Sequence, residues 1–272
     1  MVVPTKVLNR IRTLSMGDFM VNYRGWNQEL MEVKYRYFPT VSEIASLCPT
    51  HRDVFLSKVQ GLKPLENKNV VYGRLLHEAF LMPLRLVIEN KRRRSLIDLL
   101  YAGKQRLMRK IPSEIRAYAE KVYDVACSLA LNWAHEEYQI PILVEPTIDA
   151  TNIGLSDSLK PDLVIGLIPC EFTIMSEKCF KRKEIALAAY ALAIESMTQN
   201  PVNYGILASI RIGGRVKVRW RLVPLTDQLR RMVIEERDKV ARIVEYGDDP
   251  GISPSCSDFC LWREVCLESY NH

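Results

Sequence analysis

The sequence predicts a mixed α/β domain in which helices are combined with a central sheet. Hydrophobic residues follow a helical spacing over most of the N-terminal half, and the pattern changes to short β-rich runs after Pro141. A Gly213–Gly214 pair between two β-rich runs predicts a hairpin, and helical patterns flank it in the sequence. Helices and strands in this order indicate one sheet covered by helices.

The N-terminal half is predicted to be mainly helical. Residues 41–59 form one helical pattern with Ser42 as its N-cap. Residues 72–82 form a second pattern, which Pro83 interrupts or closes. We expect the helical run that follows, residues 84–138, to be an insertion in the domain.

The C-terminal half is predicted to supply the sheet. Strands or short strand-like runs are expected at residues 141–148, 151–155, 162–168, 169–175, 203–210 and 215–223. An Ala- and Leu-rich helix is expected over residues 182–197, and Thr226 caps a last helix that ends near Gly247.

Length and composition favour one soluble domain. The 272 residues are treated as a single domain, 1–272, and no apolar run approaches the roughly 20 residues that span a bilayer. The N-terminus lacks a secretory pattern, so we expect a cytoplasmic protein with no membrane partner. The net charge of +6 is compatible with a nucleic-acid partner but does not require one.

Four of the seven cysteines suggest a metal centre. Cys256, Cys260 and Cys266 lie close together near the C-terminus, and Cys48 lies far upstream. Thiolates are soft ligands, and four of them suit either tetrahedral zinc or an iron–sulfur cluster. The spacing lacks the Cys-x2-Cys pair that is typical of a zinc ribbon, and both alternatives remain open on spacing alone.

Two acidic residues suggest a second metal site. Asp162 opens one predicted strand and Glu171 lies in the next. Carboxylates on neighbouring strands can point at one place, where magnesium or manganese would find hard oxygen ligands. His77 could add an imidazole, which manganese accepts better than magnesium. The alternative is structural, with Asp162 as a turn or cap residue and Glu171 facing solvent.

A cationic run lies within the predicted helical insertion. Arg92, Arg93 and Arg94 follow Lys91, and they could contact nucleic-acid phosphates in a salt-dependent way. The alternative is that they form a solvated helix face.

Several of these pieces occur in one characteristic order. They are Cys48-Pro-Thr-His-Arg-Asp, Gly73-Arg-Leu-Leu-His77, Pro161-Asp162-Leu-Val-Ile, Glu171, Tyr190 and the C-terminal cysteine trio. The order resembles the RecB/AddB-like iron–sulfur nucleases of CRISPR adaptation, and most of all their archaeal subtype I-A branch. The resemblance covers roughly residues 20–270.

The resemblance implies a PD-(D/E)XK nuclease core with a [4Fe–4S] cluster. It implies a magnesium- or manganese-dependent exonuclease that trims single-stranded DNA ends during CRISPR spacer acquisition, together with other adaptation proteins. The implied metal ligands are His77, Asp162 and Glu171. The implied catalytic residues are Asp162, Glu171 and Tyr190. The implied cluster ligands are Cys48, Cys256, Cys260 and Cys266, so that Cys48 and residues 250–272 form the cluster region.

The chain departs from the family pattern at two positions. Thr173 stands where the family has a lysine that supplies positive charge to the reaction, and Ala186 stands where it has a glutamine. The lysines that could replace the missing one are Lys160, Lys178, Lys181 and Lys183. Two alternatives follow: a catalytically weakened DNA-binding scaffold of an adaptation complex, or an unrelated zinc-stapled nucleic-acid module.

Overall fold

The computed structural model describes residues 21–65, 67–90, 95–135, 141–174, 180–256 and 260–268, without the side chains of residues 69 and 135. The helices in this part of the chain are α2 (Val41–Ile44), α3 (Arg52–Val54), α4 (Lys68–Glu89), α5 (Leu96–Met108), α6 (Ser113–His135), α7 (Phe180–Thr198), α8 (Asp227–Tyr246) and α9 (Arg263–Glu268). Two shorter helical segments are the π-helix η1 (Phe55–Val59) and the 3-10 turn η2 (Thr151–Ile153). The strands are β1 (Ile142–Val144), β2 (Leu163–Ile165), β3 (Ile168–Thr173), β4 (Tyr204–Arg211) and β5 (Lys217–Pro224).

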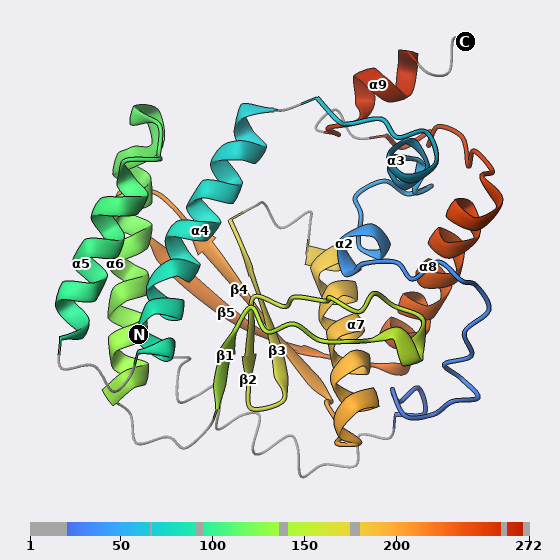
Figure 1. Cartoon of the computed structure of the whole chain (residues 1–272), viewed down its shortest axis with the longest axis horizontal. Coiled ribbons are helices and arrows are strands. Elements are labelled where there is room, and N and C mark those ends of the chain that lie inside the picture. Colours follow the sequence, from blue (N-terminus) through green and yellow to red (C-terminus); the bar gives the residue numbers. More distant parts are fainter. Residues whose placement is uncertain are drawn as a thin grey trace.

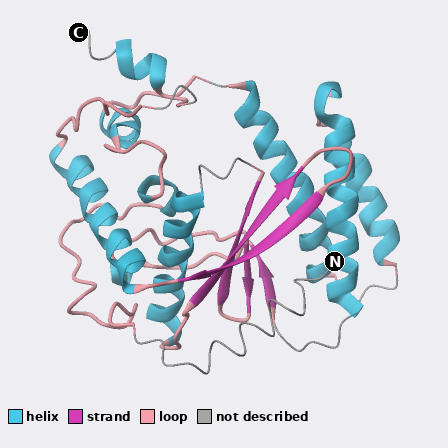
Figure 2. Ribbon diagram, turned by 180° about the vertical axis from the view of Figure 1, so that it is seen from behind, coloured by secondary structure: helices cyan, strands magenta, loops and turns pink. Residues whose placement is uncertain are grey.

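A five-stranded sheet in the order β1-β2-β3-β4-β5 forms the middle of the molecule. β3 and β4 are parallel, and the other neighbouring strands are antiparallel. Helices α4, α5 and α6 cover one face of the sheet, and α7 and α8 lie on the other side (Figure 1). The reverse view shows the same three layers (Figure 2). The predicted mixed α/β fold is confirmed.

The strands supply the two faces alternately, because successive side chains of a strand point to opposite sides. Cys170 and Phe172 of β3 join the apolar cluster that contains α4, α5 and α6. Val164 of β2 and Leu207 of β4 join the second cluster, which contains α7. This alternation places Glu171, between Cys170 and Phe172, on the α7 side of the sheet.

The local signals in the C-terminal half are confirmed. Two long strands, β4 and β5, flank the Gly213–Gly214 turn. The side chain of Thr226 caps α8, and Gly247 ends that helix in the left-handed conformation at φ 72°.

The prediction of one helix over residues 41–59 is wrong. The segment forms α2, α3 and η1, because Pro49 disfavours helical backbone before it and His51 adopts a left-handed φ of 61°. The N-cap of α2 is Thr40 rather than Ser42: Thr40 and Glu43 form a reciprocal capping box.

Pro83 does not close its helix, since α4 continues through it to Glu89. Leu81 and Leu84 on either side are fully buried, so apolar packing offsets the lost backbone hydrogen bond. For residues 151–155 the sequence predicts a turn and a short strand: the turn is present as η2, which Gly154 ends at φ 72°, and the strand is absent from these residues. The described part of residues 84–138 is helical, and its status as an insertion stays a prediction.

None of the helices in the described ranges combines the length and apolar character needed to cross a membrane.

Candidate active site

Two carboxylates meet where β2 begins and β3 approaches its end. The antiparallel register pairs Leu163 with Cys170, which places Asp162 and Glu171 next to each other beyond that pair. The backbone N–H of Phe172 donates a hydrogen bond of 2.6 Å to Asp162 Oδ2. Both acidic residues are buried, with exposed fractions of 8% and 4%. Glu171 therefore does not face solvent. Asp162 is not a simple turn residue, because it is buried and hydrogen-bonded to the backbone of β3.

His77 reaches the carboxylate pair from α4. Its Nε2 lies 3.1 Å from Asp162 Oδ2. Burial, the strongest influence, lowers the pKa of His77, but the hydrogen bond to Asp162 and the negative charges of Asp162 and Glu171 outweigh it. The pKa of His77 therefore lies above its ordinary value.

Lys183 reaches the site from the first turns of α7. Its Nζ lies 2.5 Å from Glu171 Oε2, and about a third of its side chain is exposed. Thr173 lies two residues beyond Glu171 on the same face of β3 and is buried. The chain thus places a lysine beside Glu171 from a different element than β3.

The environment of Glu171 favours its neutral form. Burial raises the pKa of Glu171 to about 7, repulsion from Asp162 adds to the rise, and Lys183 and His77 oppose it. A further cation close to this carboxyl group would stabilise its charged form.

Tyr190 of α7 holds the backbone that leads into β2. Its hydroxyl donates a hydrogen bond of 3.1 Å to the carbonyl O of Lys160. Burial raises the pKa of Tyr190, and the charges of Glu171 and Asp162 raise it further. Tyr190 is therefore a neutral group that positions the backbone at Lys160, two residues before Asp162. Ala186, one turn earlier in α7, is buried among apolar neighbours.

The donor chemistry of this site fits a hard divalent cation. Asp162, Glu171 and His77 offer two carboxylates and an imidazole, the ligand types that manganese accepts. In the described ranges, no three His, Cys, Asp or Glu side chains are arranged around a common point as metal ligands. In the structure His77 is paired with Asp162, and Lys183 with Glu171. A cation would have to replace these two contacts.

The four predicted cluster cysteines lie in one region, formed by residues 48–59, 249–256 and 260–268. Figures 1 and 2 both show α9 near α3 at one end of the molecule. Burial raises the pKa of Cys260, and the neighbouring Cys256 and Cys48 raise it further. Cys266 is buried with Phe55 of η1 and Ile243 of α8. In the described part of the chain, none of the four forms a disulfide.

Arg52 joins the two halves of the cysteine region. Its Nη1 lies 2.6 Å from the carbonyl O of Cys266 and 2.9 Å from Cys266 Sγ. Its Nε and Nη2 donate to the carboxylate of Asp249. Arg52 therefore ties the segment that follows Cys48 to the segment around Cys266.

His51 has a structural role in the same region. It is fully buried, and its Nε2 pairs with Glu236 Oε2 of α8. This contact joins the segment after Cys48 to α8, 185 residues away in the sequence.

A model of the family described as CRISPR-associated exonuclease Csa1 matches residues 1–269. This chain belongs to the Csa1 family. A relative in Saccharolobus solfataricus is 28% identical over 269 residues, covering 89% of this chain and 90% of the relative. A relative in Thermoproteus tenax is 29% identical over 281 residues, covering 96% of each chain. Both relatives are named CRISPR-associated exonuclease Csa1.

Membership of the Csa1 family confirms the CRISPR-associated exonuclease family that the sequence resembles. The RecB-like core, the subtype and the iron–sulfur cluster stay predictions. Among the four candidate lysines, the structure brings Lys183 to Glu171, whereas Lys178 lies outside the described residues. The predicted phosphate contacts Arg92, Arg93 and Arg94 also lie outside them.

Sequence reasoning missed Arg52 and a row of basic residues on β5. Arg52 lies in the Cys48-Pro-Thr-His-Arg run, where the cysteine could have drawn attention to it. The β5 row shows in the sequence as Lys217, Arg219 and Arg221 at every second position.

Proposed function

We propose that this chain is a magnesium- or manganese-dependent exonuclease that trims single-stranded DNA ends during CRISPR spacer acquisition. The observation that carries the proposal is the convergence of Asp162, Glu171, His77 and Lys183 at one end of β2 and β3. Membership of the Csa1 family supports the same reaction class.

Each side chain has a defined part in this proposal. Asp162, Glu171 and His77 would hold the divalent ion, which when bound supplies activation of water and neutralisation of phosphate charge. Asp162 is held in place by the N–H of Phe172, and Tyr190 fixes the backbone before it. Lys183 would place a positive charge where negative charge develops on the phosphodiester. The RecB/AddB-like nucleases that the sequence resembles use a lysine at the position of Thr173 for this contribution.

The cysteine region has a separate, structural part. Cys48, Cys256, Cys260 and Cys266 would hold the [4Fe–4S] cluster, with zinc as the alternative. The influence of Cys256 and Cys48 on the pKa of Cys260, and the contact of Arg52 with Cys266 Sγ, support a centre that joins the Cys48 segment to the C-terminal segment. Such a centre would join residues that are about 200 positions apart and thereby restrict the unfolded chain.

The test compares wild type with Asp162→Ala, both prepared without oxygen, on end-labelled single-stranded DNA with manganese. We expect the variant to lose activity by at least about 100-fold. Loss of a residue that only hydrogen-bonds a metal ligand costs up to about 100-fold, and loss of the ligand itself should cost more. Asp157→Ala is the matched control: it removes an exposed aspartate from the chain just before β2 and should leave cleavage unchanged.

Absence of cleavage by wild type with intact DNA binding would instead favour the scaffold function. Cleavage by Asp162→Ala at the wild-type rate would contradict the proposed site. Iron and zinc analysis of the same anaerobic preparation decides between the cluster and the zinc alternative.

A further inference from the structure

A row of cations lies along the outer strand of the sheet. Lys217, Arg219 and Arg221 of β5, here called the β5 row, are all exposed. The residues between them, such as Trp220, are partly buried against the apolar cluster of α4, α5 and α6. The sequence holds no acidic residue between Glu195 and Asp227, so this stretch of the sequence has a net positive charge.

Strand register places the β5 row on the same face of the sheet as the candidate active site. Glu171 of β3 is opposite Leu207 of β4, which is opposite Arg221 of β5. Residues that are directly opposite in a sheet share a face, so Arg221 lies two strand spacings from Glu171, or roughly 10 Å. The row therefore begins beside the carboxylates.

The next steps in the register extend the row away from the carboxylates. Thr173, Ser209 and Arg219 are opposite one another, one pair further along the strands. Beyond them Arg211 of β4 is opposite Lys217. Alternate residues of a strand are roughly 7 Å apart, so the row forms a line of charges along β5 whose Arg221 end lies level with Glu171.

The row is fixed to the elements that carry the active site. Arg221 Nη2 donates a 2.6 Å hydrogen bond to Glu184 of α7, one residue after Lys183. The guanidinium of Arg221 also lies over the ring of Phe180, at 5.1 Å from its centroid. From the opposite face, Trp220 packs edge-on against Phe172, with ring centroids 5.8 Å apart.

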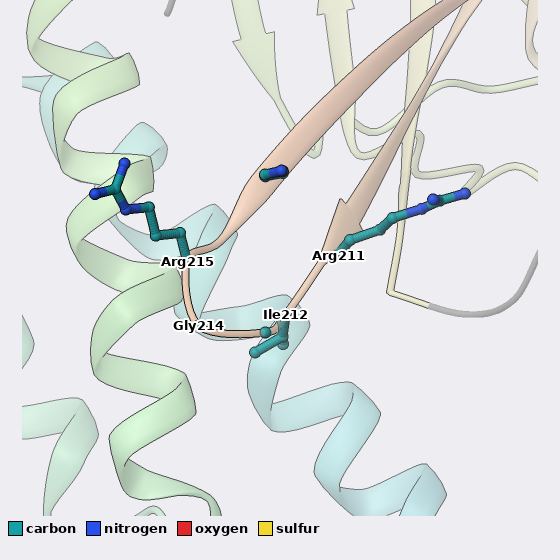
Figure 3. Close-up of a pocket in the computed structure, with 6 residues that line it drawn as sticks. Arg211, Ile212, Gly214 and Arg215 are labelled. Atoms are coloured by element: carbon teal, nitrogen blue, oxygen red, sulfur yellow. The ribbon is translucent and has the colours of Figure 1, made fainter.

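The hairpin at the far end of the row has two sides. Arg211, Ile212, Gly213, Gly214, Arg215 and Lys217 line an open hollow around the turn (Figure 3). Figure 3 shows the side chains of Arg211 and Arg215 pointing away from each other, and Arg215 lies on the side of the helical layer. Only one side of the hairpin therefore continues the β5 row.

We propose that the β5 row binds the phosphate backbone of single-stranded DNA and leads its end to Asp162 and Glu171. The charge complementarity is direct, because a nucleic-acid backbone is a line of anions and the row is a line of exposed cations. The inference rests on the proposed function and names the surface that the substrate follows.

The test measures binding of a short fluorescent single-stranded oligonucleotide by anisotropy, without divalent metal, from ~50 to ~200 mM salt. The variant is K217Q/R219Q, which leaves the Arg221 contact with α7 intact. The matched control is K110Q/R215Q, which removes one exposed lysine and one exposed arginine outside the row. Thermal unfolding of all three proteins verifies that the exposed substitutions leave the fold intact.

We expect K217Q/R219Q to weaken binding several-fold and to reduce the slope of log K against log salt by roughly 0.7 for each lost phosphate contact. The control should keep the wild-type slope. Equal slopes for wild type and K217Q/R219Q would overturn the inference while the proposed exonuclease stands or falls on its own cleavage test. An equal loss in the control would also overturn it, because only net charge would then matter. Absence of binding by wild type would overturn the inference, and the proposed function would still be decided by the cleavage test.

Discussion

Two buried glutamates lie near opposite ends of α7: Glu195 belongs to the helix, and Glu171 belongs to the neighbouring strand β3. Their environments are opposite in character. Glu195, near the end of α7, is fully buried, whereas Glu171 lies beside the start of α7 and is 4% exposed. The groups that donate to the carboxylate of Glu195 are Arg24 Nη1, the N–H of Gly25, the N–H of Val202, and Nη1 and Nη2 of Arg230. Glu171 has the cation Lys183 on one side and the carboxylate of Asp162 on the other.

This difference distinguishes a buried carboxylate with a structural role from one that could take part in a reaction. A carboxylate whose oxygens accept hydrogen bonds from several fixed donors joins parts of the fold. A carboxylate beside a second one is repelled, its pKa rises, and a further cation would stabilise it. Glu195 is the first kind, and Glu171 is the second.

Removing the carboxylate of Glu195 should have the largest effect on folding. Glu195→Ala leaves the fully buried guanidinium of Arg230 without its ion pair, which should lower the free energy of unfolding by about 3–5 kcal/mol. Urea denaturation measures this change. The control on the same helix, Glu184→Ala, breaks the exposed pair with Arg221 and should cost less than about 1 kcal/mol. Equal losses in the two variants would remove the contrast between a structural and a chemical glutamate.

Removing the cation beside Glu171 should act on cleavage more than on folding. Lys183→Met should slow cleavage by about 100-fold, the usual loss when a charge-stabilising donor is removed. Lys181→Met, which removes an exposed lysine two residues earlier in α7, should leave the rate unchanged.

The position of the lysine can be tested separately by moving it back to β3. The double variant K183M/T173K returns the charge to the same face of the strand that carries Glu171 and should recover part of the lost activity. A wild-type rate for Lys183→Met would show that its contact with Glu171 has no part in the reaction.

The smallest expected effect is a pH dependence of stability in the metal-free protein. The pKa of Glu171 rises from 4.5 to about 7 on folding, so the folded state holds more protons than the unfolded state between these values. The contribution of Glu171 protonation to the free energy of unfolding is therefore fully present below about pH 4.5 and is lost as the pH rises through about 7. The raised pKa of His77 has the same sign, and its share is lost above its ordinary value of 6.5.

Urea denaturation at mildly acidic and mildly alkaline pH, with chelator, measures this loss. We expect it to be on the order of 1 kcal/mol, because the charges of Asp162, Lys183 and His77 partly cancel at Glu171. Glu171→Gln should remove most of it, and a variant that keeps the full pH dependence would contradict the assignment to Glu171.

Local signals in the sequence determined a large part of the fold. The Gly213–Gly214 hairpin, the cap of α8 at Thr226 and its end at Gly247 follow from turn and cap chemistry, which depends on neighbouring residues. Where distant packing competes, local signals failed: residues 41–59 break into three segments, and α4 continues through Pro83.

By itself the sequence determined the candidate residues Asp162, Glu171 and His77, together with the four cysteines, because their identity and order are properties of the chain. Only the tertiary structure decided that Lys183 serves Glu171, since α7 must first pack against the sheet to bring it there. The same holds for the β5 row, whose relation to Glu171 depends on the register across β3, β4 and β5. Both contacts join residues on different elements, and their distance is set by packing and strand pairing rather than by position along the chain.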